Sequence, residues 1–240
     1  MKVSLISCTP NAAQLLVFTK STRLTMSPGL LEKIMEWPQS RIEEELAYMA
    51  NTIPSSWEFV DYVFLVEGVS RAYTHQQVRT RNGSFAQQTM RVLDMGEYEY
   101  VLTEANKRDT ASLNIIANTN RYIRNSYAAL IKSGVAPEDA RGILPTNIAT
   151  NIVCKFNLRT FSELCKSRTG GRTQGEYQQV VNAMADAVLT VHPWAEQFLF
   201  PAKRDAFDEI EQFAKEEFGG DLLKKGKLLK VVDKMRKAAK

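Results

Sequence analysis

Residues 75–91 read HQQVRTRNGSFAQQTMR and contain three arginines, four glutamines and no carboxylate. The nearest acidic residues along the chain are Glu67 and Asp94. An arginine without an acidic neighbour needs an anion from elsewhere, and phosphate suits the guanidinium because it accepts two parallel hydrogen bonds. The amide and hydroxyl side chains suit recognition of a polar ring such as a nucleobase. A solvated basic loop is the plain alternative, and composition alone favours it.

Basic residues are concentrated at the C-terminal end of the chain. The 240 residues are 44% hydrophobic and carry a formal net charge of +4. Residues 221–240 contain eight Lys or Arg and two Asp, a net charge of +6, which leaves −2 for the remainder. This distribution argues against a main body that binds nucleic acid.

The cysteines do not predict a metal site. Cys8, Cys154 and Cys165 lack the spacing of metal ligands, and only two histidines accompany them. We interpret them as reduced thiols in a cytoplasmic protein. The N-terminal apolar run is too short for a signal peptide, and no run has the length of a membrane span. Neither a Walker phosphate loop nor a glycine-rich dinucleotide fingerprint is present.

Hydrophobic periodicity predicts an α+β fold in which helices are the majority. Strands are expected at residues 1–8, 57–66, 85–93 and 147–156. Helices are expected at residues 11–22, 30–37, 40–50, 69–78, 108–133, 158–166, 174–191, 205–218 and 221–239. Ser40 and Glu43 have the spacing of a capping box for the third of these helices.

Three further groups of arginine with polar residues follow the first stretch. Residues 166–174 read KSRTGGRTQ, again without an acid, while residues 157–159 read NLR and Arg141 precedes a glycine. The plain alternative is that each arginine caps a helix or pairs with a remote acid. Four such groups in one chain favour a ligand with several negative charges.

Conventional acid–base or nucleophilic catalysis has little support in the residues. His75 is the one histidine near a polar cluster, and a structural hydrogen bond explains it equally well. Cys154 lies in an apolar run that is typical of a core strand. Cys165 has no histidine paired with it in the sequence, so no thiol nucleophile is predicted.

The first stretch resembles a known family signature. Residues 79–81 read RTR, and Thr89 and Arg91 follow at the spacing of the Arg-His-Arg, seven residues, Ser signature of the flavin-dependent thymidylate synthases. Gln76 fits three residues before the first arginine, and Ser84 lies inside the motif. The later segments fit in order and without gaps: residues 141–145 (RGILP), residues 157–159 (NLR), Arg168, Gln174 and Glu176.

Four positions depart from the family pattern. Thr80 stands where the family usually has histidine, and Thr89 replaces a serine. Gln87 stands where a glutamate is common, and Glu163 where asparagine is common. Threonine keeps the hydroxyl at position 89, but Thr80 has no imidazole for stacking or proton transfer. The simplest explanation is a divergent member of the family, such as one encoded by a phage.

The resemblance implies a fold, a reaction and an assembly. The fold would be α+β, with helices packed around a central mixed or antiparallel sheet, as a single domain at residues 1–200. A helical basic extension would follow at residues 201–240. The reaction would be FAD-dependent reductive methylation of dUMP to dTMP, with methylenetetrahydrofolate as carbon donor and NADPH as reductant. The assembly would be a homotetramer with active sites at subunit interfaces, and neither membrane nor nucleic acid is an expected partner.

The resemblance also carries residue roles to this chain. Arg168 is expected to be catalytic, because a guanidinium against the uracil ring would stabilise negative charge that develops there. The residues expected to bind FAD are Ser55, Arg79, Thr80, Arg81, Gln87, Asn157, Leu158, Arg159 and Glu163. The residues expected to bind dUMP are Gln76, Arg79, Gln87, Gln88, Thr89, Met90, Arg91, Arg141 and Arg168.

Two alternatives remain open from the sequence. The changes at Thr80, Gln87 and Thr89 are compatible with a related flavoenzyme that modifies deoxyuridylate differently, for example by hydroxymethylation. A non-catalytic nucleic-acid-binding protein ranks last, because the main body is acidic. The apolar face of the C-terminal helix favours packing in an oligomer over contact with nucleic acid or a membrane surface.

Overall fold

The computed structural model describes residues 1–169, 173–200, 210, 213–214 and 222–238. The chain divides into two compact units, Met1–Phe200 and Pro201–Lys240. The first unit contains the sheet and most of the helices, so the α+β class predicted from periodicity is confirmed.

A four-stranded antiparallel sheet forms the centre of the first unit. Its order is β1-β2-β4-β3, with β1 at Lys2–Cys8, β2 at Asp61–Ser70, β4 at Ala149–Asn157 and β3 at Gly83–Gln87. Every neighbouring pair is antiparallel, so of the two expected sheet types the antiparallel one is present. The short strand β3 lies at one edge and falls within the 75–91 stretch.

Side chains of the central strand β2 alternate between two different environments. Tyr62, Phe64 and Val66 are fully buried on one face, as the period of two in a strand requires. Val63 and Leu65 point to the opposite face and are only half-buried. The sheet therefore has one face covered within the chain and one partly uncovered apolar face.

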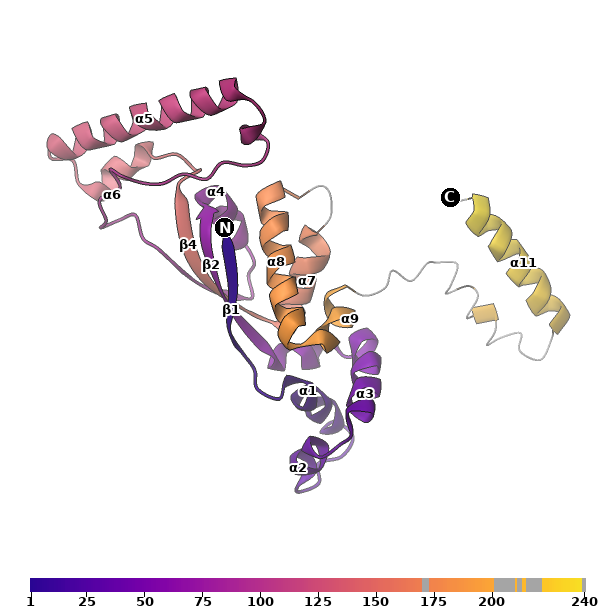
Figure 1. Ribbon diagram of the computed structural model, residues 1–240. Helices are drawn as coiled ribbons and strands as arrows, with labels where there is room; N and C mark the ends of the chain where they lie inside the picture. The colour runs from indigo at the N-terminus through magenta and orange to yellow at the C-terminus, as the bar shows by residue number, and fades with distance from the viewer. Residues whose placement is uncertain (170–172, 201–209, 211–212, 215–221, 239–240) are drawn as a thin grey trace. The chain divides into compact units, whose positions relative to one another are not determined.

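Two long helices cover the buried face. α7 at Leu158–Arg168 follows β4 directly, and α8 at Gly175–Val191 contacts both β1 and β2. Figure 1 shows both helices beside the sheet, with α1 at Ala12–Ser21, α2 at Leu30–Met35 and α3 at Gln39–Thr52 gathered at one of its ends. The 3-10 helices η1 at Pro54–Phe59 and η4 at Pro193–Ala195, with α9 at Glu196–Leu199, complete this end.

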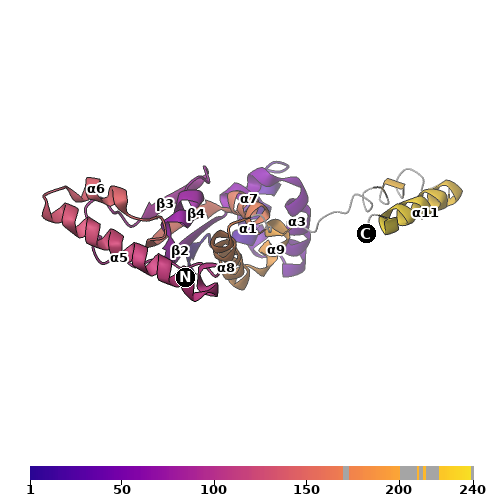
Figure 2. The same ribbon diagram turned by 90° about the horizontal axis from the view of Figure 1, so that it is seen from above.

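The longest helix lies at the other end of the sheet. α5 at Thr110–Lys132 crosses there together with α6 at Pro137–Ala140, as Figures 1 and 2 both show. η2 at Asn106–Arg108 precedes α5, and η3 at Arg141–Ile143 follows α6. Gly134 ends α5 with φ of 88°, a left-handed conformation that glycine adopts without strain. Within this helix only Asn120 and Tyr127 are buried.

Three local predictions are wrong. Trp57 belongs to η1 instead of a strand, because its ring packs against Phe198 and its Nε1 donates to the Met49 carbonyl. The capping box of Ser40 does not form, since α3 begins one residue earlier after Pro38 and no side chain caps it. The strand expected at 85–93 ends at Gln87.

The second unit is described mainly by α11 at Leu222–Ala238, which confirms the last predicted helix. Most of the helix expected at 205–218 lies outside the described residues. On α11, Val232 is buried, whereas Val231 and Met235 are more than half exposed. Among the described residues, no helix combines the length and hydropathy that crossing a bilayer requires.

Candidate functional site

The short helix α4 at Arg71–Gln77 delivers the arginines of the first stretch. Its N-cap is Ser70, whose Oγ accepts from the Tyr73 amide at 3.1 Å. Glu176 of α8 holds this cap, because its two carboxylate oxygens accept from the Ser70 amide at 2.7 Å and the Ser70 hydroxyl at 2.5 Å. Gln76, near the end of α4, donates to the Gln174 side chain. Helix α4 is thus attached to α8 at both ends.

Six predicted site residues surround one cavity of about 280 Å³, here called the arginine cavity. They come from α4 with the turn after it and from α7, which lie far apart in sequence. These six residues are Gln76, Arg79, Thr80, Arg81, Glu163 and Arg168. The cavity is completed by Asn82, Thr160, Leu164 and Ser167, none of which is among the predicted site residues.

The arginines of this cavity have no acidic partner within the described part of the chain. Arg79 and Arg81 are exposed, Arg168 is half-buried, and none of them forms an ion pair there. Glu163, the one carboxylate lining the cavity, instead lies 3.5 Å from the Arg159 Nε. Unpaired guanidinium groups around a hollow are suited to hold an anion.

Arg168 packs on the ring of Tyr177, which in turn packs against Tyr73. Its guanidinium carbon lies 5.1 Å from the ring centre of Tyr177, and Tyr73 meets that ring edge-on at 5.2 Å and 77°. Burial raises the pKa of Tyr177, while Thr80 and Arg168 beside its hydroxyl act in the opposite direction. Sequence reasoning missed both tyrosines, because neither follows a local motif.

The other residues expected to bind FAD lie near α7 but make internal contacts. Asn157 caps α7, since its Oδ1 accepts from the Thr160 amide at 2.9 Å, and Leu158 is fully buried in the core. Arg159 pairs with Glu58 at 2.7 Å, and Ser55 accepts a hydrogen bond from Arg23 at 3.0 Å. Arg159 therefore pairs with an acid that is remote in sequence, which is the plain alternative to binding a ligand.

The residues expected to bind dUMP after β3 lie outside the arginine cavity. Gln87 is fixed by hydrogen bonds from its Nε2 to the hydroxyls of Thr74 at 2.9 Å and Thr150 at 3.4 Å. The Thr89 hydroxyl accepts from the Arg91 amide at 3.0 Å, and the side chain of Arg91 pairs with Glu138 at 2.7 Å. Met90 between them is half-buried.

Arg141 lies beside a second arginine. Its Nε donates to the Glu138 carbonyl at 3.0 Å. Burial, and after it the charge of Arg141, lower the pKa of Arg71, whose guanidinium donates to the carbonyl of Gln88. The Nε of Arg71 is buried and has no hydrogen-bond partner among the described residues. Two neighbouring arginines, of which Arg71 has an unsatisfied Nε, are a second place suited to an anion.

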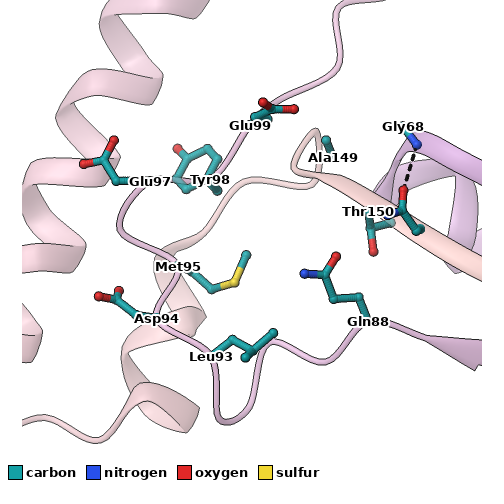
Figure 3. A pocket seen from close by; sticks show the side chains of 11 residues that line it. Gly68, Gln88, Leu93, Asp94, Met95, Glu97, Tyr98, Glu99, Ala149 and Thr150 are labelled. Carbon is teal, nitrogen blue, oxygen red and sulfur yellow. Dashed lines mark hydrogen bonds between the residues drawn. The ribbon is translucent and has the colours of Figure 1, made fainter.

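Two further cavities share Gly68, Glu99 and Ala149 in their linings, and neither is lined by Arg71 or Arg141. One, of about 410 Å³, is shown in Figure 3, where the side chains of Gln88 and Met95 point toward one another across it. Its lining includes Asp94, Glu97 and Glu99, an acidic set that disfavours phosphate. The other, of about 910 Å³, lies between the 99–108 segment and the start of α8.

The thiols and imidazoles do not form a nucleophilic pair. Cys154 and Cys165 are fully buried, and burial raises the pKa of each to about 12. His75 is exposed, and His192 contacts Tyr62 at 3.1 Å in a different part of the unit. Within the described residues no group of His, Cys, Asp and Glu is placed to hold a metal ion.

Comparison with known proteins gives a consistent result. A family model described as "Thymidylate synthase complementing protein" matches residues 4–194. The chain is 32% identical over 209 residues to a flavin-dependent thymidylate synthase of Nitratidesulfovibrio vulgaris, covering 80% of this chain and 84% of the relative. It is 29% identical over 211 residues to the enzyme of that name from Clostridium tetani, with the same coverage. The match spans the sheet, α4, α7 and α8, and this chain therefore belongs to the thymidylate synthase complementing protein family.

Proposed function

We propose that this chain is a flavin-dependent thymidylate synthase that methylates dUMP to dTMP, with FAD as cofactor and with methylenetetrahydrofolate and NADPH as co-substrates. The observation that carries the proposal is the arginine cavity. Motif residues separated by about ninety positions meet around it, and its three arginines have no acidic partner in the described chain. The names of the two relatives support the same activity.

The residues around the arginine cavity fit part of an FAD molecule. Arg79 and Arg81 offer guanidinium groups to its pyrophosphate, and the Thr80 hydroxyl lies between them in sequence. The cavity, at about 280 Å³, is just below the roughly 300–1,000 Å³ of small-molecule sites. One subunit thus supplies only part of the surface that a dinucleotide needs. When bound there and reduced by NADPH, FAD would supply the hydride that the methylation requires.

The residues of the chain itself bind and polarise the nucleotide. Arg168 directs its guanidinium against the uracil ring, where it stabilises negative charge that develops as the ring carbon becomes nucleophilic. This activation needs no thiolate, which agrees with the buried, protonated state of Cys154 and Cys165. Gln76 and Gln87 are held by hydrogen bonds to Gln174 and Thr74, so their amides are pre-oriented.

The phosphate of dUMP is assigned to Arg91 and Arg141, outside the arginine cavity. Arg91 and Arg141 both approach Glu138, one through its carboxylate and one through its carbonyl. A dianionic phosphate competes well with an exposed carboxylate for these guanidinium groups. Neither Arg91 nor Arg141 lines the arginine cavity of the same chain, which supports a site completed by neighbouring subunits.

A homotetramer is the proposed assembly, and two exposed apolar surfaces support it. Val63 and Leu65 lie on the partly uncovered sheet face. On α5, Ile115 and Tyr122 are 67% and 75% exposed, one above the other at a spacing of seven residues. Exposed apolar groups of this kind mark protein interfaces. Sedimentation analysis should give a tetramer, and Tyr122→Asp should shift it to smaller species.

A visible spectrum and a product assay test the activity. Purified protein should be yellow with a flavin absorption band, and the band should bleach on addition of NADPH. With methylenetetrahydrofolate, dUMP should be converted to a product with the mass of dTMP. A product of another mass would favour the alternative reaction, such as hydroxymethylation, with which Thr80 is compatible. Colourless protein that cannot be reconstituted with FAD would contradict the proposal.

A further inference from the structure

Behind the arginine cavity lies a stack of aromatic rings that the proposed mechanism does not yet use. The Arg168 guanidinium carbon is 5.1 Å from the ring centre of Tyr177, within the range of a cation–π contact. Tyr73 meets the Tyr177 ring edge-on at 5.2 Å, and both tyrosines are fully buried. The Tyr177 ring is therefore fixed from one side and offers its face to Arg168 from the other.

The polar atoms in this stack are incompletely satisfied. The Tyr177 hydroxyl and the Arg168 Nε are both buried, and neither has a hydrogen bond of normal geometry among the described residues. The groups beside the Tyr177 hydroxyl are Thr80 and Arg168. A phenol hydroxyl donates one hydrogen bond and also accepts, so it can serve a guanidinium and a second hydroxyl at once. A small shift of the Arg168 side chain would thus allow its Nε to donate a hydrogen bond to the Tyr177 hydroxyl, which would satisfy both groups.

Thr80 reaches this stack from the other wall of the cavity. It lies between Arg79 and Arg81, after α4, whereas Arg168 ends α7 and Tyr177 belongs to α8. Threonine is short and uncharged, so it contributes neither a ring nor a positive charge here. The Tyr177 phenol is therefore the aromatic group beside both Thr80 and Arg168.

We propose that Tyr177 is a positioning residue for Arg168, and that Thr80 fixes the orientation of its hydroxyl. The ring face holds the guanidinium plane by cation–π contact, and the hydroxyl holds the Nε edge. Arg168 therefore keeps its remaining N–H groups directed into the cavity. This inference rests on the proposed function, because it assigns a support to the arginine that is proposed to polarise the uracil ring.

Two substitutions of Tyr177 separate the ring from the hydroxyl. Tyr177→Leu removes both, and kcat/KM for dUMP should fall about tenfold, chiefly in kcat, because the lost orientation matters most when charge develops. Tyr177→Phe keeps the ring and should restore part of that loss. Rates are measured per flavin-loaded site, so that unfolded protein does not count. Phe161→Leu is the matched control, since Phe161 is an equally buried aromatic residue whose ring contacts are with Tyr62 and Phe64.

A double-mutant cycle tests the role of Thr80. Thr80→Val and Tyr177→Phe each remove one hydroxyl and should each lower kcat/KM about fivefold. The double variant should lose no more than either single variant, because the two hydroxyls act as a unit.

The outcomes separate this inference from the proposed function. A wild-type chain that forms no dTMP would overturn the proposed function and this inference with it. An active wild type with unchanged kcat/KM in Tyr177→Leu would overturn the inference alone. So would an equal loss in Phe161→Leu, or fully additive losses in the cycle.

Discussion

Arg168 and Arg91 are both proposed to bind the nucleotide, yet they differ in burial and in ion pairing. Arg168 is half-buried, stacked on Tyr177 and free of any acid in the described chain. Arg91 is exposed and already paired with Glu138. The first arginine belongs to a region built on α4, α7 and α8, whose side chains are fixed by the core. The second belongs to a surface region between β3 and α6. A single chain thus pre-organises one half of the proposed site and leaves the other half adjustable.

The largest expected effect comes from removing the arginine of the fixed region. Arg168→Ala should lower kcat about 10²- to 10³-fold, as the loss of one preorganised charge donor does in other enzymes. Arg168→Lys keeps the charge but not the planar donor geometry and should recover only part of the rate. Initial rates of dTMP formation measure this. The control is Lys33→Ala, which removes an exposed positive charge on α2; equal losses in both variants would contradict the assignment.

A smaller effect is expected from loosening the attachment of α4. Glu176→Ala removes both acceptors of Ser70 and should lower the free energy of unfolding by about 2–3 kcal/mol, the range for hydrogen bonds to a charged group. Glu176→Gln keeps one acceptor and should lose about half as much. Urea denaturation measures both. Unchanged stability in Glu176→Ala would mean that the core alone holds α4.

Substitutions in the surface region should change the affinity for dUMP and leave the free energy of unfolding nearly unchanged. Arg91→Ala should raise KM for dUMP about tenfold, because one charged contact to the phosphate is lost. Its free energy of unfolding should change by less than about 1 kcal/mol, since the pair with Glu138 is exposed. Glu138→Gln should instead lower KM about twofold by releasing Arg91. A large loss of stability in either variant would remove the distinction between the two regions.

The smallest effect concerns the far end of α8 and depends on pH. Burial lowers the pKa of His192, next to Tyr62. Below the unfolded pKa of about 6.5 the unfolded chain binds a proton that the folded chain resists, so stability should fall as pH decreases from about 7. His192→Asn should flatten this dependence in thermal melts at pH values from about 7 to about 5.5. An unchanged slope in that variant would assign the effect to other groups.

Periodicity and motif order predict the helices and the cavity residues well. They do not predict contacts between residues that are far apart in the sequence. The helices that became α5, α7 and α8 follow from apolar spacing, and the residues of the arginine cavity follow from motif order. Tyr177 was missed because its importance depends on contacts with Arg168 and Thr80, and sequence gives no distance between them. A tyrosine in the first turn of a helix has no local signal for such a role.

The surface region was predicted less well, for two physical reasons. The strand expected at 85–93 stops at Gln87, whose side-chain amide is held by Thr74 and Thr150. The partner of Arg91 is Glu138, 47 residues away, whereas the residues favoured a ligand because no acid was near in sequence. Outside this region, Trp57 has strand propensity but is held by Met49, eight residues earlier, and by Phe198, far along the chain.

The burial of two of the three cysteines has a practical consequence. Cys154 and Cys165 are inaccessible, and with pKa values of about 12 they stay protonated at neutral pH. Thiol-directed alkylating agents and air oxidation should therefore spare them in the folded chain. Cys8, half-buried near the end of β1, is left as the single position that a maleimide dye can label. A fluorophore could therefore be attached at one defined position without the need to remove any native cysteine.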